Sequence, residues 1–221
     1  MVKINKTYPA PAPINREKDY HGGLVFDTIC SDFHKKCYLC EAKPISINIE
    51  HIVPHKSDET LKFKWENLFY ACVHCNSIKG TKYDNILDCT KDDPEENIVI
   101  KYDPFPNKKP EFESKDKSIS PQVDSTIKLL EEIVCSPPTD QKREGAKNLC
   151  KKLYNEVTGL VDKLEEYFNA VDNHHGEDEE KYLKQCVARC IYRSSPFAAF
   201  KRAIIRKIPE YYDIFKSELE K

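Results

Sequence analysis

The sequence predicts an α+β protein that is mostly helical, in which a small zinc-binding strand-strand-helix unit precedes a helical C-terminal region. Two Cys-x-x-Cys pairs flank two strand-like runs within residues 24–90. Over residues 122–221, apolar side chains recur at helical spacing instead. The chain has 221 residues, of which 39% are hydrophobic and 33% charged, so it is long enough to bury a core as one or two domains.

The first 90 residues are expected to hold an arm and one folded unit. Residues 1–23 are rich in proline and lack apolar periodicity, so we expect an extended N-terminal arm. Residues 24–90 are expected to begin with a short helix over 24–33. Two strands are predicted next, one ending at His51 and one at Leu68–Ala71, and a short helix follows the second strand.

The rest of the chain divides into a linker and helices. Residues 91–121 combine an acidic patch, one strand-like run and a Pro/Lys/Ser-rich stretch, and we expect a linker there. Residues 122–221 predict several helices, including a long amphipathic one after Thr139. Within them, residues 181–207 contain eight Lys or Arg and no Asp or Glu. This imbalance suits contact with phosphates, and an ordinary solvated basic face is the alternative.

The N-terminus and the hydropathy pattern bear on location. No run of about 18 apolar residues occurs, and the N-terminus lacks the apolar segment of a secretory signal, so we expect a cytoplasmic protein with no membrane partner. Disulfides seldom persist in such a compartment, so the ten cysteines are expected to be thiols or metal ligands. The net charge of −2 argues against binding of polyanions by the whole surface.

The two cysteine pairs, Cys37/Cys40 and Cys72/Cys75, predict a structural zinc site. Four thiolates complete a tetrahedron and leave no open position for substrate. The 31 residues between the pairs exceed the roughly 15–20 of a simple zinc ribbon, so a folded segment is expected between them. The alternative is four cysteines that are merely buried. His74, inside the second pair, is expected to be exposed and not to bind the metal.

Four polar residues stand between and beside these cysteines: Glu50, His51, Asn67 and Asn76. The stretches CYLC, IEHIVPH, ENLFYACVHCN and SIKG resemble the HNH endonuclease family with its zinc knuckles, over about residues 37–80. The resemblance implies a ββα-metal fold in which His51 takes a proton from the attacking water. It also implies that Glu50 and Asn76 hold one catalytic divalent ion, and that the amide of Asn67 holds the loop that aims His51.

The implied chemistry agrees with the residue types. An imidazole with an ordinary pKa near 6.5 is a suitable base at neutral pH. A hard, oxygen-bound ion such as Mg²⁺ or Mn²⁺ stabilises charge on a phosphate. Lys79, one turn past Asn76, is a candidate donor to a substrate phosphate, with a solvated lysine as the alternative. Most members of the family have Asp where this chain has Glu50, which puts the metal preference and the rate in doubt.

Three stretches, KINK near the N-terminus, NLFYACVHCN and the late SPFAAFKR, further resemble the HNH subunit of the two-component Septu anti-phage system. That resemblance implies a partner ATPase that controls the nuclease, with phage DNA as the substrate. Candidate docking surfaces are the proline-rich arm and the apolar faces of the C-terminal helices. The main alternative is a zinc-knuckle module that binds nucleic acid or protein without catalysis, and a weaker one is a nuclease that cuts RNA.

Overall fold

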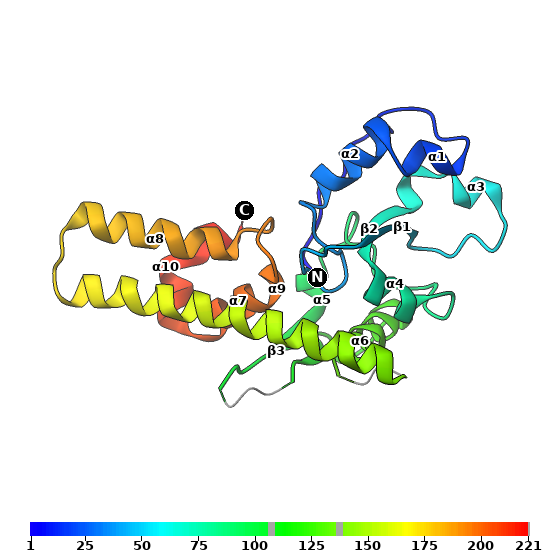
Figure 1. Ribbon diagram of the computed structural model, residues 1–221. Coiled ribbons are helices and arrows are strands. Elements are labelled where there is room, and N and C mark those ends of the chain that lie inside the picture. Colours follow the sequence, from blue (N-terminus) through cyan, green and yellow to red (C-terminus); the bar gives the residue numbers. More distant parts are fainter. Residues whose placement is uncertain (106–108, 136–138, 221) are drawn as a thin grey trace.

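Helices make up most of the structure, and two small antiparallel sheets complete it (Figure 1). The computed structural model describes residues 1–105, 109–135 and 139–220. Its mixed architecture, with a small β-containing part followed by long helices, confirms the predicted fold class. None of the helices in these ranges is long and apolar enough to cross a membrane.

The N-terminal part contains the predicted strand-strand-helix unit. Its elements, in chain order, are α1 (Glu17–Tyr20), α2 (Gly23–Asp32), β1 (Ile47–His51), α3 (Glu59–Lys62), β2 (Leu68–Cys72) and α4 (Val73–Lys79). The strands pair antiparallel, with Ile47 opposite Cys72 and His51 opposite Leu68. Helix α4 ends at Gly80, whose φ of +49° lies in the left-handed region that glycine tolerates best. The register therefore places Ile47 beside Cys72, whereas Glu50 and His51 lie at the other end of β1.

Residues 91–121, predicted to be a linker, contain a short helix and a second hairpin. These elements are α5 (Pro94–Asn97), β3 (Ile98–Lys101) and β4 (Glu111–Ser114). Ile98 and Phe112 are buried in the same core as β2, so the hairpin packs as part of the fold. The sequence shows β3 as a strand-like run. It does not show β4, because Phe112 is the only apolar residue in that strand.

Five helices form the C-terminal region: α6 (Pro121–Val134), α7 (Asp140–Asp172), α8 (Glu177–Ile191), α9 (Ala198–Lys207) and α10 (Pro209–Leu219). The Thr139 side chain accepts a hydrogen bond from the backbone N–H of Lys142 and so caps α7, as the sequence predicts. Helix α7 runs from beside α6 to the far end of the molecule and returns as α8 (Figure 1).

Two apolar clusters stabilise the molecule. The larger one joins the N-terminal residues, both sheets, α6, the first half of α7 and the start of α9. The smaller one lies between α7, α8, α9 and α10 at the far end. Met1 and Ile4 are buried in the larger cluster, and the Lys6 ammonium donates to the carbonyls of Trp65 and Leu68. The start of the predicted arm is therefore packed into the core.

The first cysteine pair is flanked by two buried charges that contact the C-terminal region. Lys36 donates to the carbonyl oxygens of Arg193 and Ser195, at 2.5 and 2.9 Å. The Glu41 carboxylate accepts the N–H of Ala199 at 3.0 Å. The first zinc knuckle and the segment before α9 are thus one packed unit.

The basic run at 181–207 is largely neutralised inside the protein. Arg202 is fully buried, and its Nε lies 2.9 Å from both carboxylate oxygens of Glu95. Arg206 reaches the same carboxylate at 2.5 Å. Two further pairs from this run are Lys201–Glu156 and Arg193–Asp93. Half of the eight cations therefore pair with carboxylates of the protein, which weakens the case for a continuous phosphate-contacting face.

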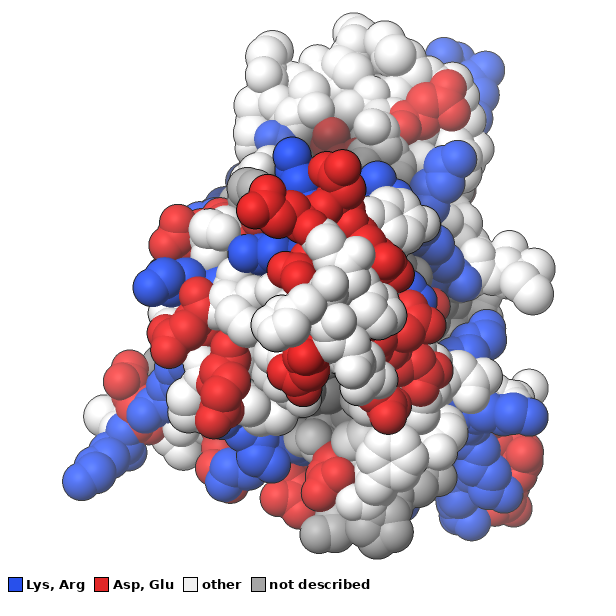
Figure 2. All heavy atoms as spheres, turned by 90° about the vertical axis from the view of Figure 1, so that its left-hand side faces the viewer, with Lys and Arg blue, Asp and Glu red and all other residues white. Residues whose placement is uncertain are grey.

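The far end of the molecule is acidic rather than basic. Figure 2 faces this end, where Asp and Glu side chains surround a mostly uncharged centre. The first turn of α8 alone supplies four of them, Glu177, Asp178, Glu179 and Glu180. Such a surface repels phosphate and is unsuited to contact with nucleic acid.

Candidate metal centre and active site

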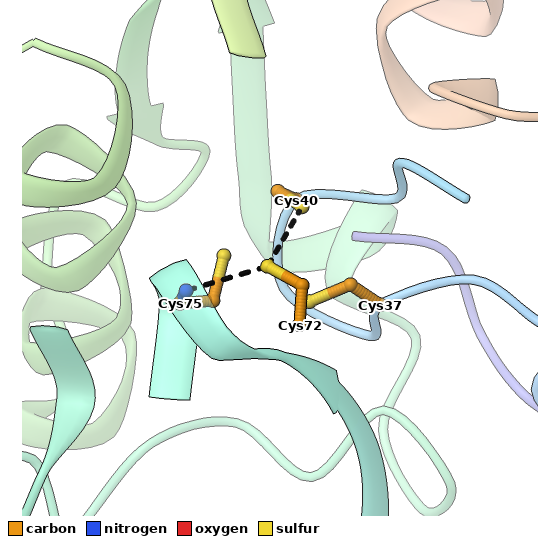
Figure 3. A group of neighbouring side chains, drawn as sticks. All are labelled: Cys37, Cys40, Cys72 and Cys75. Carbon is orange, nitrogen blue, oxygen red and sulfur yellow. Dashed lines mark hydrogen bonds between the residues drawn. The ribbon is translucent and has the colours of Figure 1, made fainter. Parts of the chain in front are cut away.

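Four cysteine sulfurs converge where the turn after α2 meets the end of β2 and the start of α4 (Figure 3). All four are buried, and their sulfur atoms lie within 4.8 Å of one another. The Cys40 and Cys72 sulfurs are 3.9 Å apart. Tetrahedral zinc with Zn–S bonds of about 2.3 Å places its sulfurs roughly 3.8 Å apart. The cluster therefore fits a structural zinc ion, and it is the only such group within the described residues.

Local structure brings the cysteines together. Cys37 and Cys40 lie in the turn after α2, whereas Cys72 ends β2 and Cys75 lies in the first turn of α4. The backbone N–H of Cys75 donates to the Cys72 sulfur at 3.3 Å (Figure 3). The N–H of Tyr38 donates to the Tyr70 carbonyl at 3.0 Å and ties the first turn to β2. These local backbone contacts therefore bring the four sulfurs together.

His74 is half-buried, so the expectation that it is exposed is wrong. Its Nε2 lies 3.2 Å from the carbonyl oxygen of Ile133 at the end of α6. Its ring also packs on Gly145 of α7, where an added Cβ would lie only 2.5 Å from Nδ1. Packing of α6 and α7 against α4 covers this side chain. The sequence does not show that packing.

His51, at the end of β1, is half-buried with one nitrogen engaged by the backbone. Its Nε2 lies 2.9 Å from the carbonyl oxygen of Lys62. A carbonyl only accepts hydrogen bonds, so Nε2 carries the hydrogen and the neutral ring presents the Nδ1 lone pair. Burial lowers the pKa of His51 below its ordinary value, which keeps the ring neutral at physiological pH. The arrangement suits a general base acting through Nδ1.

Two aromatic rings flank His51. Tyr20 of α1 is buried and lies edge-on to His51, with ring centroids 5.9 Å apart. His55, in the following loop, lies edge-on from another side at 4.7 Å. Glu17 and Lys62 form an ion pair at 2.5 Å that ties α1 to α3. The N-terminal segment thus helps to enclose the candidate base, although proline content alone does not predict this.

Asn67 holds the loop that follows His51. Its Oδ1 accepts the N–H of Val53 at 2.8 Å, and its Nδ2 donates to the Val53 carbonyl at 2.9 Å. The same Nδ2 donates to the Leu61 carbonyl at 3.0 Å. Asn67 is buried, so these three bonds fix the loop from beneath.

Glu50 points away from His51 into the protein, because successive side chains of a strand face opposite sides. The Tyr38 hydroxyl donates to Oε1, and the Lys79 ammonium lies 3.7 Å from the same oxygen. Oε2 is buried without a hydrogen-bond partner among the described residues. Burial raises the pKa of Glu50 to about 7. Nothing in the sequence identifies Tyr38 as a partner of this carboxylate.

Lys79 is almost completely buried, so the alternative of a solvated lysine is wrong. Its ammonium donates to the backbone carbonyl of His51 at 3.0 Å, beside the Glu50 carboxylate. Burial lowers the pKa of Lys79. The cation therefore pairs with Glu50 and holds the end of β1.

The Glu50 carboxylate fits one ligand of a divalent ion. Asn76 is half-buried and precedes Lys79 by three positions on α4, so both lie on one helix face. That face reaches Glu50 through Lys79. A buried carboxylate oxygen without a partner among the described residues is a donor that suits a hard cation.

One of three comparisons with known proteins found a match. Residues 37–82 match the family model described as HNH endonuclease. The matched segment contains all four zinc-site cysteines together with Glu50, His51, Asn67 and Asn76. Comparison with curated proteins and with solved structures found no match. The family match supports a nuclease with a divalent metal, and the buried cysteine cluster is compatible with zinc.

Proposed function

We propose that this chain is a metal-dependent endonuclease that hydrolyses phosphodiester bonds of DNA, with His51 as the general base. The observation that carries the proposal is the fixed tautomer of His51. Its Nε2 is held by the Lys62 carbonyl, so Nδ1 is the basic atom. This ring lies in the segment that matches the HNH endonuclease model.

The proposed reaction is attack of water on a backbone phosphorus. Nδ1 of His51 accepts a proton from water as the water oxygen bonds to phosphorus, and the bond from phosphorus to the 3′ oxygen breaks. The Lys62 carbonyl then accepts a hydrogen bond from the imidazolium, so the ring keeps its orientation. Asn67 maintains the loop during this step through its bonds to Val53 and Leu61.

Glu50 and Asn76 would hold the catalytic ion, Mg²⁺ or Mn²⁺. When bound, such an ion stabilises negative charge on the phosphate and on the leaving 3′ oxygen. Lys79 occupies the neighbourhood of Glu50 and remains a candidate contact for a substrate phosphate. That role requires its ammonium to leave the Glu50 carboxylate and the His51 carbonyl.

The test is cleavage of supercoiled plasmid by purified protein with Mg²⁺, Mn²⁺ or EDTA. His51→Ala should lower the cleavage rate by about 10²–10⁴-fold, the usual contribution of a general base. His175→Ala is the matched control, because His175 is exposed at the distant turn before α8. Zinc content should remain unchanged in both variants. Equal cutting by wild type and His51→Ala would favour a zinc-knuckle module that binds nucleic acid or protein without catalysis.

We also propose that the nuclease is the effector of an ATPase-associated anti-phage complex of the Septu type. The support is the resemblance of three separated stretches of sequence. In the fold two of them touch, because Lys6 of KINK donates to the Leu68 carbonyl within NLFYACVHCN. Co-purification with such an ATPase, and a change in plasmid cutting when it is added, are the expected results. Absence of both would contradict the partnership and leave the nuclease proposal unaffected.

A further inference from the structure

The loop after β1 presents a second imidazole beside His51. The His51 and His55 ring centroids are 4.7 Å apart, with an angle of 69° between the ring planes. His55 is half-buried, so part of the residue reaches solvent. Asn67 bonds the Val53 backbone two residues earlier, so the same clamp that supports His51 supports this residue.

The backbone fixes the tautomer of His55. The N–H of Ser57 donates to His55 Nδ1 at 3.2 Å. Nδ1 is therefore an acceptor, and in the neutral ring the hydrogen sits on Nε2. No hydrogen bond formed among residues 1–105, 109–135 and 139–220 engages that Nε2. The loop thus offers one free N–H donor next to the ring that offers a free lone pair.

The two residues that follow His55 have unfavourable backbone conformations. Lys56 and Ser57 have φ angles of +44° and +72°, in the left-handed region that residues other than glycine seldom adopt. The N–H of Asp58 closes the turn on the His55 carbonyl at 2.7 Å. Two consecutive residues in this conformation persist only where the surroundings determine them, and such strain is concentrated at functional sites.

We propose that His55 contacts the substrate, with its Nε2–H donating to a non-bridging oxygen of the phosphate that is attacked. The inference rests on the proposed nuclease function. In this arrangement, Nδ1 of His51 removes the proton from water. The Nε2–H of His55 donates a hydrogen bond to the phosphate oxygen on which negative charge develops. A fixed donor aimed at developing charge stabilises the transition state more than the ground state.

Two isosteres separate this role from a purely structural one. In His55→Asn, the amide oxygen can replace Nδ1 and keep the Ser57 N–H bond, but the donor at Nε2 is lost. In His55→Gln, the amide can return a donor near the Nε2 position, but the bond that holds the loop is lost. A substrate contact predicts that Gln cuts faster than Asn, and a structural role predicts the reverse order.

The experiment measures kcat and KM of wild type, both variants and His51→Ala on a short duplex with one cleavable linkage. His55→Asn should lower kcat by about 10²-fold, the typical effect of losing one such donor, with zinc content and melting temperature unchanged. His55→Gln should recover part of that loss. Replacement of either non-bridging oxygen by sulfur gives a second measurement. Sulfur at the contacted oxygen should slow wild type more than His55→Asn, because the variant has no donor left to lose.

The outcomes separate the two proposals. If His55→Asn cuts like wild type, or if sulfur slows both proteins equally, while His51→Ala is inactive, the contact by His55 is wrong and the nuclease stands. If wild type does not cut, or if His51→Ala cuts like wild type, the nuclease proposal fails and the role of His55 fails with it. If His55→Asn folds poorly, His55→Gln replaces it in the sulfur experiment. The contact is supported if sulfur at the contacted oxygen slows wild type and His55→Gln equally. It is overturned if sulfur at either non-bridging oxygen has the same effect on the rate of His55→Gln.

Discussion

At the scale of single residues, Glu50 shows how a carboxylate is kept in a nearly dry environment. One of its oxygens accepts the Tyr38 hydroxyl and faces Lys79, while the other has no partner among the described residues. Desolvation disfavours the charged form, and it outweighs the attraction of Lys79, so the pKa of Glu50 rises to about 7. A protein without added divalent ion must therefore fold with this side chain protonated or bear the cost of its charge.

Glu50→Gln should change how stability depends on pH. The folded pKa of about 7 exceeds the unfolded pKa of about 4.5, so the folded state binds more protons between these values. The contribution of Glu50 is fully present below about pH 4.5 and is lost as pH rises through about 7. Relative to wild type, Glu50→Gln should gain on the order of 2–3 kcal/mol between pH 5 and pH 8.

Chemical denaturation without added divalent ions measures this difference at several pH values. Glu59→Gln is the matched control, because Glu59 is exposed on α3 and should give a nearly constant offset. If the unfolding free energy of Glu50→Gln also differs from wild type by the same amount at every pH, the carboxylate is hydrated in solution. Added Mg²⁺ should stabilise wild type more than Glu50→Gln, because only the carboxylate supplies the negative charge that binds a divalent ion.

Sequence patterns predict only part of this chemistry. They predict the zinc cysteines, and the amide bonds of Asn67 to the loop are those that the family resemblance implies. They do not predict Tyr38 as a partner of Glu50, or the two tautomers of the histidine pair. Those contacts depend on the register of β1 with β2 and on how α4 packs, which residue types and spacing do not specify.

At the scale of elements, α7 packs one glycine against the second zinc knuckle. Gly145 leaves room for the His74 ring, whereas Gly159, two-thirds of the way along the same helix, has open space around it. Both residues are in regular helix, so they share the same intrinsic cost relative to alanine. The difference between the stability effects of substituting these two glycines therefore measures the contact between α7 and α4.

Gly145→Ala should destabilise the protein by about 1–3 kcal/mol, because the new Cβ would lie 2.5 Å from Nδ1 of His74 and the ring must move. Gly159→Ala should stabilise it by up to about 1 kcal/mol through helix propensity. Urea unfolding followed by circular dichroism measures both. Equal stabilisation by the two substitutions would show that α7 does not press on His74 in solution.

The elements themselves follow from sequence to different degrees. Helix α7 is predicted by the spacing of its apolar residues, and Leu153, Val157 and Leu160 are indeed buried along one side. Strand β4 escapes prediction, because one buried phenylalanine between two glutamates gives too little pattern. Periodicity detects elements that bury a whole face, and short edge elements depend on their neighbours.

At the scale of the whole molecule, a buried ion pair connects the hairpin region to the C-terminal helices. Arg202 of α9 contacts both oxygens of Glu95 and also donates to the carbonyls of Ile191 and Leu219. Three segments thus meet at one guanidinium. The basic composition of residues 181–207 shows the cation but not its partner, which lies 107 positions away in the sequence.

Arg202→Ala should lower the free energy of unfolding by about 3–5 kcal/mol, since it leaves the Glu95 carboxylate with less compensation and two carbonyls without donors. Arg189→Ala is the matched control from the same basic run, because Arg189 is exposed on α8 and should change stability by less than about 0.5 kcal/mol. Denaturant unfolding provides the comparison. Similar small effects for both would mean that solvent reaches Arg202.

The contacts of Lys36 and Glu41 with residues 193–199 bear on how the protein is made. The two charges flank the first zinc knuckle, and their partners follow 157 to 159 positions later in the chain. At a synthesis rate of roughly 5–20 residues per second, these partners leave the ribosome on the order of ten seconds or more after the knuckle. Until then, Glu41 can pair with the N-terminal ammonium at 3.0 Å and with Lys36 at 3.9 Å, so the later contacts complete the packing of this segment. A chain that ends before residue 193 would therefore lack the contacts that complete the packing around Cys37 and Cys40.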